Sequence, residues 1–212
     1  WSKAICFVLA VMLFSFLPAE AGTTNSWRVF RSLSNGATLG PNKVLNPGME
    51  ILGSPLANWN SFGTGYATTT TNAHGGIRSM QCSAAVATEV HGGSQTITLN
   101  QTAPKVLKLS GWSKAQAVTG SSDSDYSVYL DIIYTNATPL WGQTINFSVG
   151  THDWEYKEAF IIPALPIQSL SCYLLFRNSH TGTVWFDDVS ITEVQDSVVQ
   201  FDGAAVTAGP PN

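Results

Sequence analysis

The stretch GTVWFDDVSI, residues 182–191, decides the fold, because it places two adjacent carboxylates inside a run that otherwise has the pattern of a buried β-strand. Unpaired buried charge is costly, so at least one of these aspartates is expected to meet a cation. The chain has only 10 Lys and Arg, and another carboxylate, Glu50, closes the strand-like segment 46–51. Glu50 and Asp188 therefore look like two ends of one oxygen-ligand site, for which calcium is the natural occupant in a secreted protein. A solvated Asp-Asp turn and a carboxylate pair that shares a proton remain the alternatives.

The N-terminus has the pattern of a secretory signal peptide. Lys3 precedes an apolar run over residues 4–17, and Pro18 is followed by Ala-Glu-Ala at 19–21. An apolar run of about 14 residues is shorter than the roughly 20 that a membrane span needs, and no later segment is long enough. We therefore expect cleavage after Ala21, a secreted protein and no membrane span in the mature chain. Because the sequence begins without Met, we also expect it to be a fragment of a longer gene product.

Composition narrows the class of protein and of partner. About 190 residues after Ala21 are enough for one domain with a substantial core. A charged fraction of 11% with 18 Gly and 7 Trp is typical of an extracellular all-β module. The formal net charge of −4 and the lack of Lys/Arg clusters argue against nucleic acid as a partner. After cleavage, Cys82 and Cys172 remain, and their positions fit either one disulfide or two buried thiols.

Short alternating runs between Gly, Asn, Asp and Pro clusters predict a β-sandwich over residues 44–195. Residues 22–43 form a polar lead-in segment with at most one strand, over 27–30. Residues 196–212 lose the pattern and resemble a linker or the start of a truncated next domain. The eight predicted strands cover residues 80–87, 96–99, 106–114, 126–134, 144–149, 154–162, 170–177 and 184–191.

Six motifs in register over residues 44–194 carry a resemblance to a known family. They are the Asn-Pro-Gly-x-Glu segment that ends at Glu50, Trp59, AHGGIRS at 73–79, LSGWSKA at 109–115, GTHDW at 150–154 and the closing GTVWFDDV. Together they resemble the carbohydrate-binding modules of families four, nine and twenty-two. The resemblance implies a two-sheet, antiparallel jelly roll of the galactose-binding-like type, with glycan chains bound across one sheet. It also implies a monomeric, noncatalytic module appended to a glycoside hydrolase or another polysaccharide-active enzyme.

The same resemblance implies a set of calcium ligands. In these modules the Glu of the first strand and the second Asp of the closing strand bind the ion, together with main-chain oxygens of one loop. Here the matching carboxylates are Glu50 and Asp188, and the matching loop runs from His74 to Ile77. Calcium takes six to eight hard oxygens and tolerates carbonyls, so it can tie two strands to an irregular loop.

Period two separates side chains that face the core from those that face outward. In residues 106–114, Leu107 and Leu109 share one face and Trp112 lies on the other, polar face. The same sorting puts Tyr129 and Asp131 outward in 126–134, and Tyr173 and Arg177 outward in 170–177. Aromatic rings stack on pyranose C–H faces while Asp and Arg bond hydroxyls, so these residues are candidates for a sugar groove, with Trp141 in a loop as its wall. The alternative is that these aromatic side chains lie beneath the lead-in segment or a loop.

Sequence motifs for autonomous catalysis are missing. The chain has no Gly-x-Ser-x-Gly, His-Glu-x-x-His, phosphate loop or Cys-x-x-Cys. Glycoside hydrolysis needs two facing carboxylates, and Asp131 with Glu155 or Glu158 is the pair that the sequence offers. We therefore expect a binding module. The alternative function is an extracellular structural or adhesion domain of the same fold that binds a protein partner.

Overall fold

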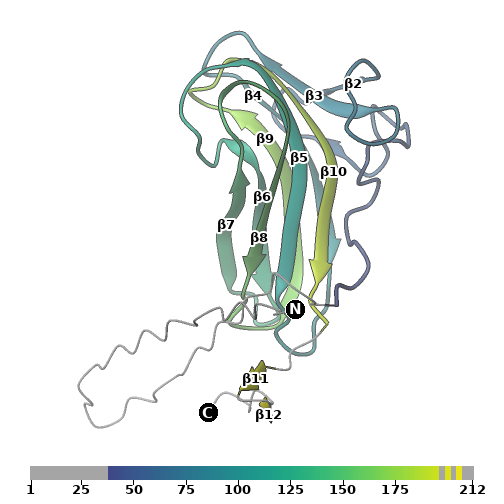
Figure 1. The fold of residues 1–212 in the computed structure, drawn as a ribbon, viewed down its shortest axis with the longest axis vertical. Helices are drawn as coiled ribbons and strands as arrows, with labels where there is room; N and C mark the ends of the chain where they lie inside the picture. Colours follow the sequence, from purple (N-terminus) through teal and green to yellow (C-terminus); the bar gives the residue numbers. More distant parts are fainter. Residues whose placement is uncertain (1–37, 196–198, 202–203, 207–212) are drawn as a thin grey trace, which may run out of the picture.

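The computed structural model describes residues 38–195, 199–201 and 204–206 (Figure 1). The predicted signal peptide, the possible strand at 27–30 and most of the lead-in segment lie outside the described residues, as does much of 196–212. Within the described part of the chain, no helix has the length and apolarity needed to cross a membrane.

Two five-stranded sheets make up the fold, with strand orders β1-β4-β9-β6-β7 (sheet A) and β2-β3-β10-β5-β8 (sheet B). Every pairing within them is antiparallel, and Figure 1 shows the long strands of the two layers running side by side. The strands are β1 Asn60–Ser61, β2 Ala67–Thr69, β3 Ser79–Ala84, β4 Val90–Thr98, β5 Leu107–Val118, β6 Tyr126–Tyr134, β7 Pro139–Asn146, β8 Gly150–Ile161, β9 Ile167–Arg177 and β10 Gly182–Glu193, and a separate hairpin is formed by β11 Val199–Phe201 and β12 Ala204–Val206. The predicted all-β sandwich is confirmed. Each of the eight predicted strands overlaps one of β3 to β10, but β4 and β7 begin five or six residues earlier than predicted, and β1 and β2 were not predicted.

The core lies between the sheets and follows the predicted period of two. From β5 it takes Leu107 and Leu109, while β6 and β9 contribute alternate residues in the same way. Those from β6 are Tyr126, Val128, Leu130, Ile132 and Tyr134, and those from β9 are Leu170, Cys172, Leu174 and Phe176, with Ile167 at the start of β9. Aliphatic and aromatic side chains on the inner face of each strand therefore hold the two sheets together. The outward-facing side chains are not needed for packing between the sheets.

The two cysteines are buried free thiols on different sheets, Cys82 on β3 and Cys172 on β9. Of the two arrangements that the sequence allowed, the structure has the unbridged one. Burial raises the pKa of the Cys172 thiol to about 12 and raises that of Cys82 as well. Both side chains therefore act as small apolar groups in the core.

The segment 46–51 is not the strand that the sequence suggested. Asn46 and Met49 adopt positive φ angles of 52° and 59°, and the Asn46 amide bonds across the segment. Its Nδ2 donates to the carbonyls of Ile51 (2.9 Å) and Ala57 (3.0 Å), while its Oδ1 accepts from the Ile51 N–H at 2.9 Å. An asparagine that satisfies three backbone groups replaces the hydrogen bonds of a sheet, so the chain turns here.

Residues 38–43 belong to the sandwich, although the sequence analysis placed them in the lead-in segment. Leu39 forms a β-bridge with Val194, and Lys43 N–H donates to Ile191 O at 2.8 Å. The Asn42 amide donates to Val189 O and accepts from Ile191 N–H, each at 3.0 Å. These contacts line the second half of β10, beyond the half that pairs with β3. The folded unit therefore begins before Val44.

Truncating a ring in the shared core should destabilise the whole sandwich. Phe186 of β10 is fully buried between the sheets, so Phe186→Ala should lower the free energy of unfolding by about 3–5 kcal/mol. Chemical denaturation monitored by circular dichroism measures this. Gln116→Ala, on the exposed outward phase of β5, is the matched control and should change it by less than about 0.5 kcal/mol. A cost below about 1 kcal/mol for Phe186→Ala would contradict this core.

Candidate functional site

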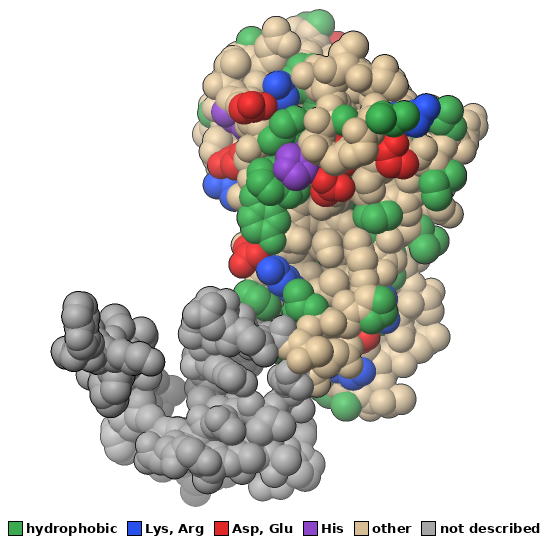
Figure 2. Space-filling model, turned by 45° about the vertical axis from the view of Figure 1, so that its right-hand side comes forward, with side chains coloured by type: hydrophobic (Ala, Val, Ile, Leu, Met, Phe, Trp, Pro, Cys, Tyr) green, Lys and Arg blue, Asp and Glu red, His purple; other side chains and the backbone are tan. Residues whose placement is uncertain are grey.

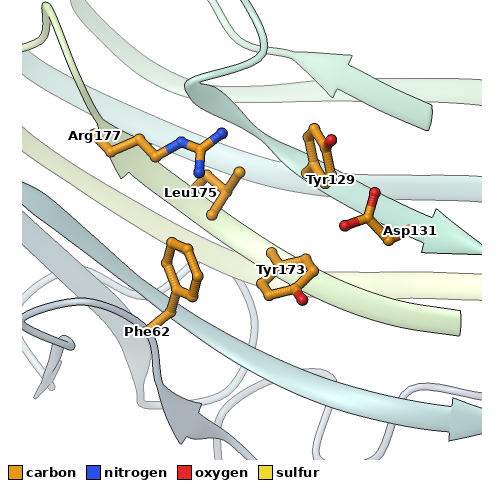
Figure 3. A pocket seen from close by; sticks show the side chains of 6 residues that line it. All are labelled: Phe62, Tyr129, Asp131, Tyr173, Leu175 and Arg177. Carbon is orange, nitrogen blue, oxygen red and sulfur yellow. The ribbon is translucent and has the colours of Figure 1, made fainter. Parts of the chain in front are cut away.

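A hollow of about 130 Å³ opens on the outer face of sheet A. Three strands shape it: β6 and β9 supply most of the side chains, and one ring comes from the residue after β1. Figure 3 shows the two tyrosines on neighbouring strands, with a carboxylate on one side and a guanidinium on the other. The lining residues are Phe62, Tyr129, Asp131, Tyr173, Leu175 and Arg177.

The aromatic floor of the hollow follows from strand register. Tyr129 of β6 and Tyr173 of β9 are direct cross-strand partners, and their ring centroids lie 6.1 Å apart at an interplanar angle of 73°. Phe62 meets Tyr173 edge-on, with centroids 5.2 Å apart. Because both tyrosines are in the outward phase, their rings are only partly buried. The arrangement gives three adjoining rings that a flat apolar ligand face can contact.

An anchored loop holds the cationic side of the hollow. Arg177 Nε donates to Asp125 Oδ1 at 2.7 Å, and its guanidinium carbon lies 5.9 Å from the Phe62 ring centroid. The same loop carries Asp123, whose Oδ1 lies 3.0 Å from Nε2 of the fully buried His180. Burial tends to raise the pKa of Asp123, but the hydrogen bond with His180 and backbone N–H groups hold it below its ordinary value. Asp125 thus fixes one edge of Arg177 and leaves its terminal nitrogens near the hollow.

The anionic side is built at a bulge between β6 and β7. Leu130 pairs with Gln143 and Ile132 with Leu140, so Trp141 and Gly142 together face the single Asp131. Gly142 has a φ of 70°, and its N–H donates to Asp131 Oδ1 at 3.2 Å. Burial and the neighbouring Asp131 carboxylate raise the pKa of Tyr129. Tyr129 therefore stays a neutral phenol at physiological pH, beside a carboxylate held in place by a backbone donor.

Trp141 belongs to a strand, so its prediction as a loop residue is wrong. It lies on edge strand β7 at the bulge opposite Asp131, and its side chain is 59% exposed. The bulge contains Gly142 at a positive φ angle, and because glycine is also typical of loops, composition alone predicts a loop here. Trp141 is opposite Asp131 in the strand pairing but is not among the residues that line the hollow, so its role as a groove wall stays a prediction.

Trp112 lies on the opposite sheet, which corrects the prediction that it shares a face with Tyr129 and Tyr173. Its outward phase on β5 is confirmed, but β5 belongs to sheet B. Period two separates inside from outside and does not reveal which of two layers a strand joins. The Trp112 ring instead stacks on His74, with centroids 3.8 Å apart.

The two proposed calcium ligands approach one glycine-rich loop. Glu50 Oε1 accepts from the N–H groups of Ile77 (2.8 Å) and Arg78 (2.9 Å), and Asp188 Oδ2 lies 2.7 Å from His74 Nδ1. A Cβ on Gly75 would lie 2.6 Å from Asp188 Oδ2, and one on Gly76 would overlap Glu50 Oε1. The glycines are therefore needed for both carboxylates to come this close to the backbone.

The donor set fits a hard cation only in part. Two carboxylates that face one loop supply the oxygen chemistry that calcium prefers. However, no group of three or more His, Cys, Asp or Glu among the described residues is placed to hold a metal. A calcium ion here would depend on main-chain oxygens of the loop from His74 to Ile77 for most of its ligands.

Asp187 has a separate, structural role. Its side chain is fully buried, and Oδ2 accepts from the N–H groups of His74 (2.8 Å) and Gly75 (3.2 Å). Burial raises its pKa to about 6 although these hydrogen bonds oppose the shift. Both of these bonds are to backbone groups, whereas Arg78 pairs with Glu50 at 3.6 Å.

The carboxylates considered for hydrolysis lie on different sheets. Asp131 faces outward from sheet A, whereas Glu155 and Glu158 belong to β8 of sheet B. The pair that the sequence offered for glycoside hydrolysis is therefore not assembled.

Phe62, Leu175 and Asp125 contribute to the hollow or its support and were not predicted. A signal existed for Leu175, because it shares the phase of Tyr173 and Arg177 on β9. Phe62 follows a two-residue strand in a Gly- and Ser-rich stretch. No alternating pattern there predicts which way its side chain points. Asp125 has no local sequence signal for its role, since its partner Arg177 is 52 residues away in sequence.

Solved structures with a similar fold include carbohydrate-binding modules and a phage enzyme. A family 16 carbohydrate-binding module matches with a TM-score of 0.53 at 17% identity, over 71% of this chain and 99% of the module. The CBM22-1 xylan-binding domain of Paenibacillus barcinonensis Xyn10C matches with a TM-score of 0.51 at 14% identity, over 77% and 99%. The enzymatically active domain of tailspike protein 4 from bacteriophage CBA120 matches with a TM-score of 0.52 at 15% identity, over 72% and 21%. The chain has the β-sandwich fold of carbohydrate-binding modules.

Sequence comparison links part of the chain to much larger proteins. No protein-family model matches. The tRNA nuclease WapA of Bacillus subtilis is 36% identical over 103 residues, which is 47% of this chain. A tRNA3(Ser)-specific nuclease WapA of Bacillus spizizenii matches to the same extent. The chain spans about 4% of the length of these curated relatives.

The loop that anchors Arg177 should make stability depend on pH through Asp123. Its carboxylate has a lowered folded-state pKa, so its stabilising effect is full above the unfolded-state pKa and is lost as pH falls through the folded value. Asp123→Asn should cost about 0.5–1 kcal/mol at pH 7, because solvent screens this partly exposed carboxylate, and progressively less below pH 4, measured by denaturation at several pH values. Asp153→Asn, at an exposed ion pair with Lys114, should leave the unfolding midpoint nearly unchanged. An Asp123→Asn penalty that grew as pH fell would contradict this assignment.

Proposed function

We propose that this chain is a noncatalytic glycan-binding module that takes a polysaccharide chain in the hollow of sheet A. The observation that carries the proposal is the Tyr129–Tyr173 pair, placed side by side by register between Asp131 and Arg177. Pyranose rings present C–H faces that pack on aromatic rings, and their hydroxyls both donate and accept hydrogen bonds. The carboxylate and the guanidinium on either side supply an acceptor and donors for them.

The similarity in fold to carbohydrate-binding modules supports this proposal. The position of the hollow also supports it. The hollow is lined by outward-facing side chains of sheet A, while the inward-facing side chains of that sheet pack in the core. Hydroxyl-rich ligands need polar partners without a strong net charge, and here Asp131, Asp125 and Arg177 together leave a single net negative charge. The mode of binding is therefore stacking with lateral hydrogen bonds.

The wider setting belongs to the same proposal. We expect the protein to be secreted and the module to be one part of a longer chain, where it holds its neighbour on a polysaccharide by raising local concentration. The similarity to a small part of the WapA nucleases is compatible with a module attached to a large protein. A glycoside hydrolase or another polysaccharide-active enzyme remains the neighbour that we propose.

Removing one ring of the floor should weaken binding. Tyr173→Ala should lower the affinity for soluble neutral oligosaccharides, such as those from xylan, glucan or mannan, by about tenfold, because an aromatic contact contributes roughly 1–2 kcal/mol. Isothermal titration calorimetry measures this, with Tyr129→Ala as a second variant. Ile162→Ala, an exposed apolar residue beyond the end of β8, is the control and should bind as wild type does. If the protein binds none of these glycans, the proposal is wrong, and an adhesion domain with a protein partner is favoured instead.

Calcium is proposed as a structural ion at Glu50 and Asp188, with main-chain oxygens of the loop from His74 to Ile77. When bound, it would neutralise two carboxylates and stabilise the loop against the bulge of β10, where the register with β5 shifts between Asp187 and Ser190. A chelator should then lower the melting temperature by about 5 °C or more, because a ligand at 100 times its dissociation constant adds about 2.7 kcal/mol.

Glu50→Ala should abolish the effect of the chelator on melting, whereas Asp153→Ala, at an exposed carboxylate on β8, should retain it. Differential scanning calorimetry with and without added calcium makes the comparison. Equal melting temperatures of the wild-type protein with calcium and with chelator would rule the ion out.

A further inference from the structure

A second aromatic surface covers part of the outer face of sheet B. Trp112 of β5 and Tyr156 of β8 are direct cross-strand partners with ring centroids 5.2 Å apart. His74 stacks on Trp112 and meets the Trp154 ring edge-on, at 5.6 Å. Figure 2 shows a histidine next to acidic side chains on this side of the molecule, with hydrophobic side chains beside and below it. We refer to Trp112, Trp154, Tyr156 and His74 as the sheet B platform.

The sheet B platform is not part of the core. Trp112 and Tyr156 point away from the partner sheet, because Leu107 and Leu109 occupy the inward phase of β5. Tyr156 is 41% exposed, and Trp112 and Trp154 are half-buried. Four adjoining rings at a surface form an accessible apolar face of the kind that marks binding sites on soluble proteins.

Charged groups frame the platform at both ends, and their charges cancel. Toward one end Lys108 Nζ lies 2.7 Å from Glu158 Oε2, which also accepts from the Tyr156 hydroxyl at 2.6 Å. Toward the other end Lys114 Nζ lies 3.1 Å from Asp153 Oδ1. Hydroxyl groups can bond to each of these side chains without breaking the charge balance.

The charge pattern also selects among ligands. Two lysines paired with two carboxylates leave no positive field for a polyanion. Nucleic acids and anionic wall polymers are therefore disfavoured. A neutral ligand with flat C–H faces and many hydroxyls fits both the rings and their polar frame.

The extent of the surface suits an extended chain. Lys108 and Lys114 are six residues apart on β5, which corresponds to roughly 20 Å along a strand. Trp112 and Tyr156 lie between them, so the rings are at the middle and the ion pairs at the two ends. Such a strip offers contacts to several sugar units in a row rather than to a single terminal unit.

We infer that the sheet B platform is a second binding surface for neutral polysaccharide, centred on Trp112 and Tyr156 and separate from the hollow of sheet A. The outer faces of sheet A and sheet B lie on opposite sides of the core. One molecule would therefore hold two polysaccharide chains at once. Two weak sites on one body give avidity on a dense polysaccharide and allow the module to bridge neighbouring chains. The inference deepens the proposed function but depends on different residues.

Tryptophan fluorescence separates the two surfaces. The hollow is lined by no tryptophan, and Trp141 is the one next to it, whereas the platform contains Trp112 and Trp154. In Trp141→Phe/Tyr173→Ala, which impairs the hollow and removes its reporter, titration with soluble xylan, β-glucan or galactomannan should still change the emission. Adding Tyr156→Ala, at a position that is 41% exposed, should lower that remaining affinity about tenfold. No emission change in Trp141→Phe/Tyr173→Ala would overturn the inference.

Bridging gives a second readout with matched variants. Beads coated with the same polysaccharide should aggregate with the wild-type protein, while Tyr156→Ala and Tyr173→Ala should each still bind beads but fail to aggregate them. If Tyr173→Ala alone removes all binding and Tyr156→Ala aggregates beads as wild type does, the platform is not a site and the hollow stands. If Tyr156→Ala lowers the melting temperature but leaves binding and bead aggregation unchanged, the Tyr156 ring has only a structural role and the inference is wrong. If Tyr156→Ala alone abolishes binding, the platform is the site and the hollow is not.

Discussion

Two five-stranded sheets bury one face each against the other, and this shared core dictates the direction of every second side chain in the long strands. Leu109, Leu130, Leu174 and Phe186 are committed to the interior by their burial. The residues between them must then face outward, whatever their chemistry. The aromatic side chains on those outward positions are not required for the core. Both candidate binding surfaces arise from this one constraint.

The closing strand β10 links the core to the loops at its edge. It lies between β3 and β5 in sheet B and also pairs with residues 38–43. At its bulge the buried Asp187 carboxylate accepts backbone N–H groups of the loop at His74, so the loop cannot move away without leaving a buried carboxylate unpaired. The adjacent Asp188 then meets the His74 ring. The position of His74 against Trp112 thus depends on a strand more than 100 residues away.

Much of the fold could be predicted from the sequence, because period two and turn residues are local signals. The eight strands and the outward phases of Trp112, Tyr129 and Tyr173 are visible in this way. The layer to which each strand belongs is not, since β5 and β6 are neighbours in the chain and lie in different sheets. For that reason Trp112 was grouped with Tyr129 and Tyr173, from which the core separates it.

Local exceptions to periodicity explain the remaining differences. Asn46 turns a strand-like segment by bonding to Ile51 and Ala57, and the bulge at Gly142 disguises the strand that carries Trp141. Both depend on positive φ angles that composition only suggests. Asp125 finds its role through Arg177 on a distant strand, and such a pairing has no signature within a single sequence window.

Backbone amide shifts during a glycan titration test the central claim most directly. With soluble xylan, glucan or mannan oligosaccharides, we expect saturable shifts in two-dimensional NMR spectra at Tyr129, Asp131, Tyr173 and Leu175, which line the hollow. Core amides such as Leu109 and Leu130 should stay in place. Saturable binding that left β6 and β9 unperturbed would contradict the account.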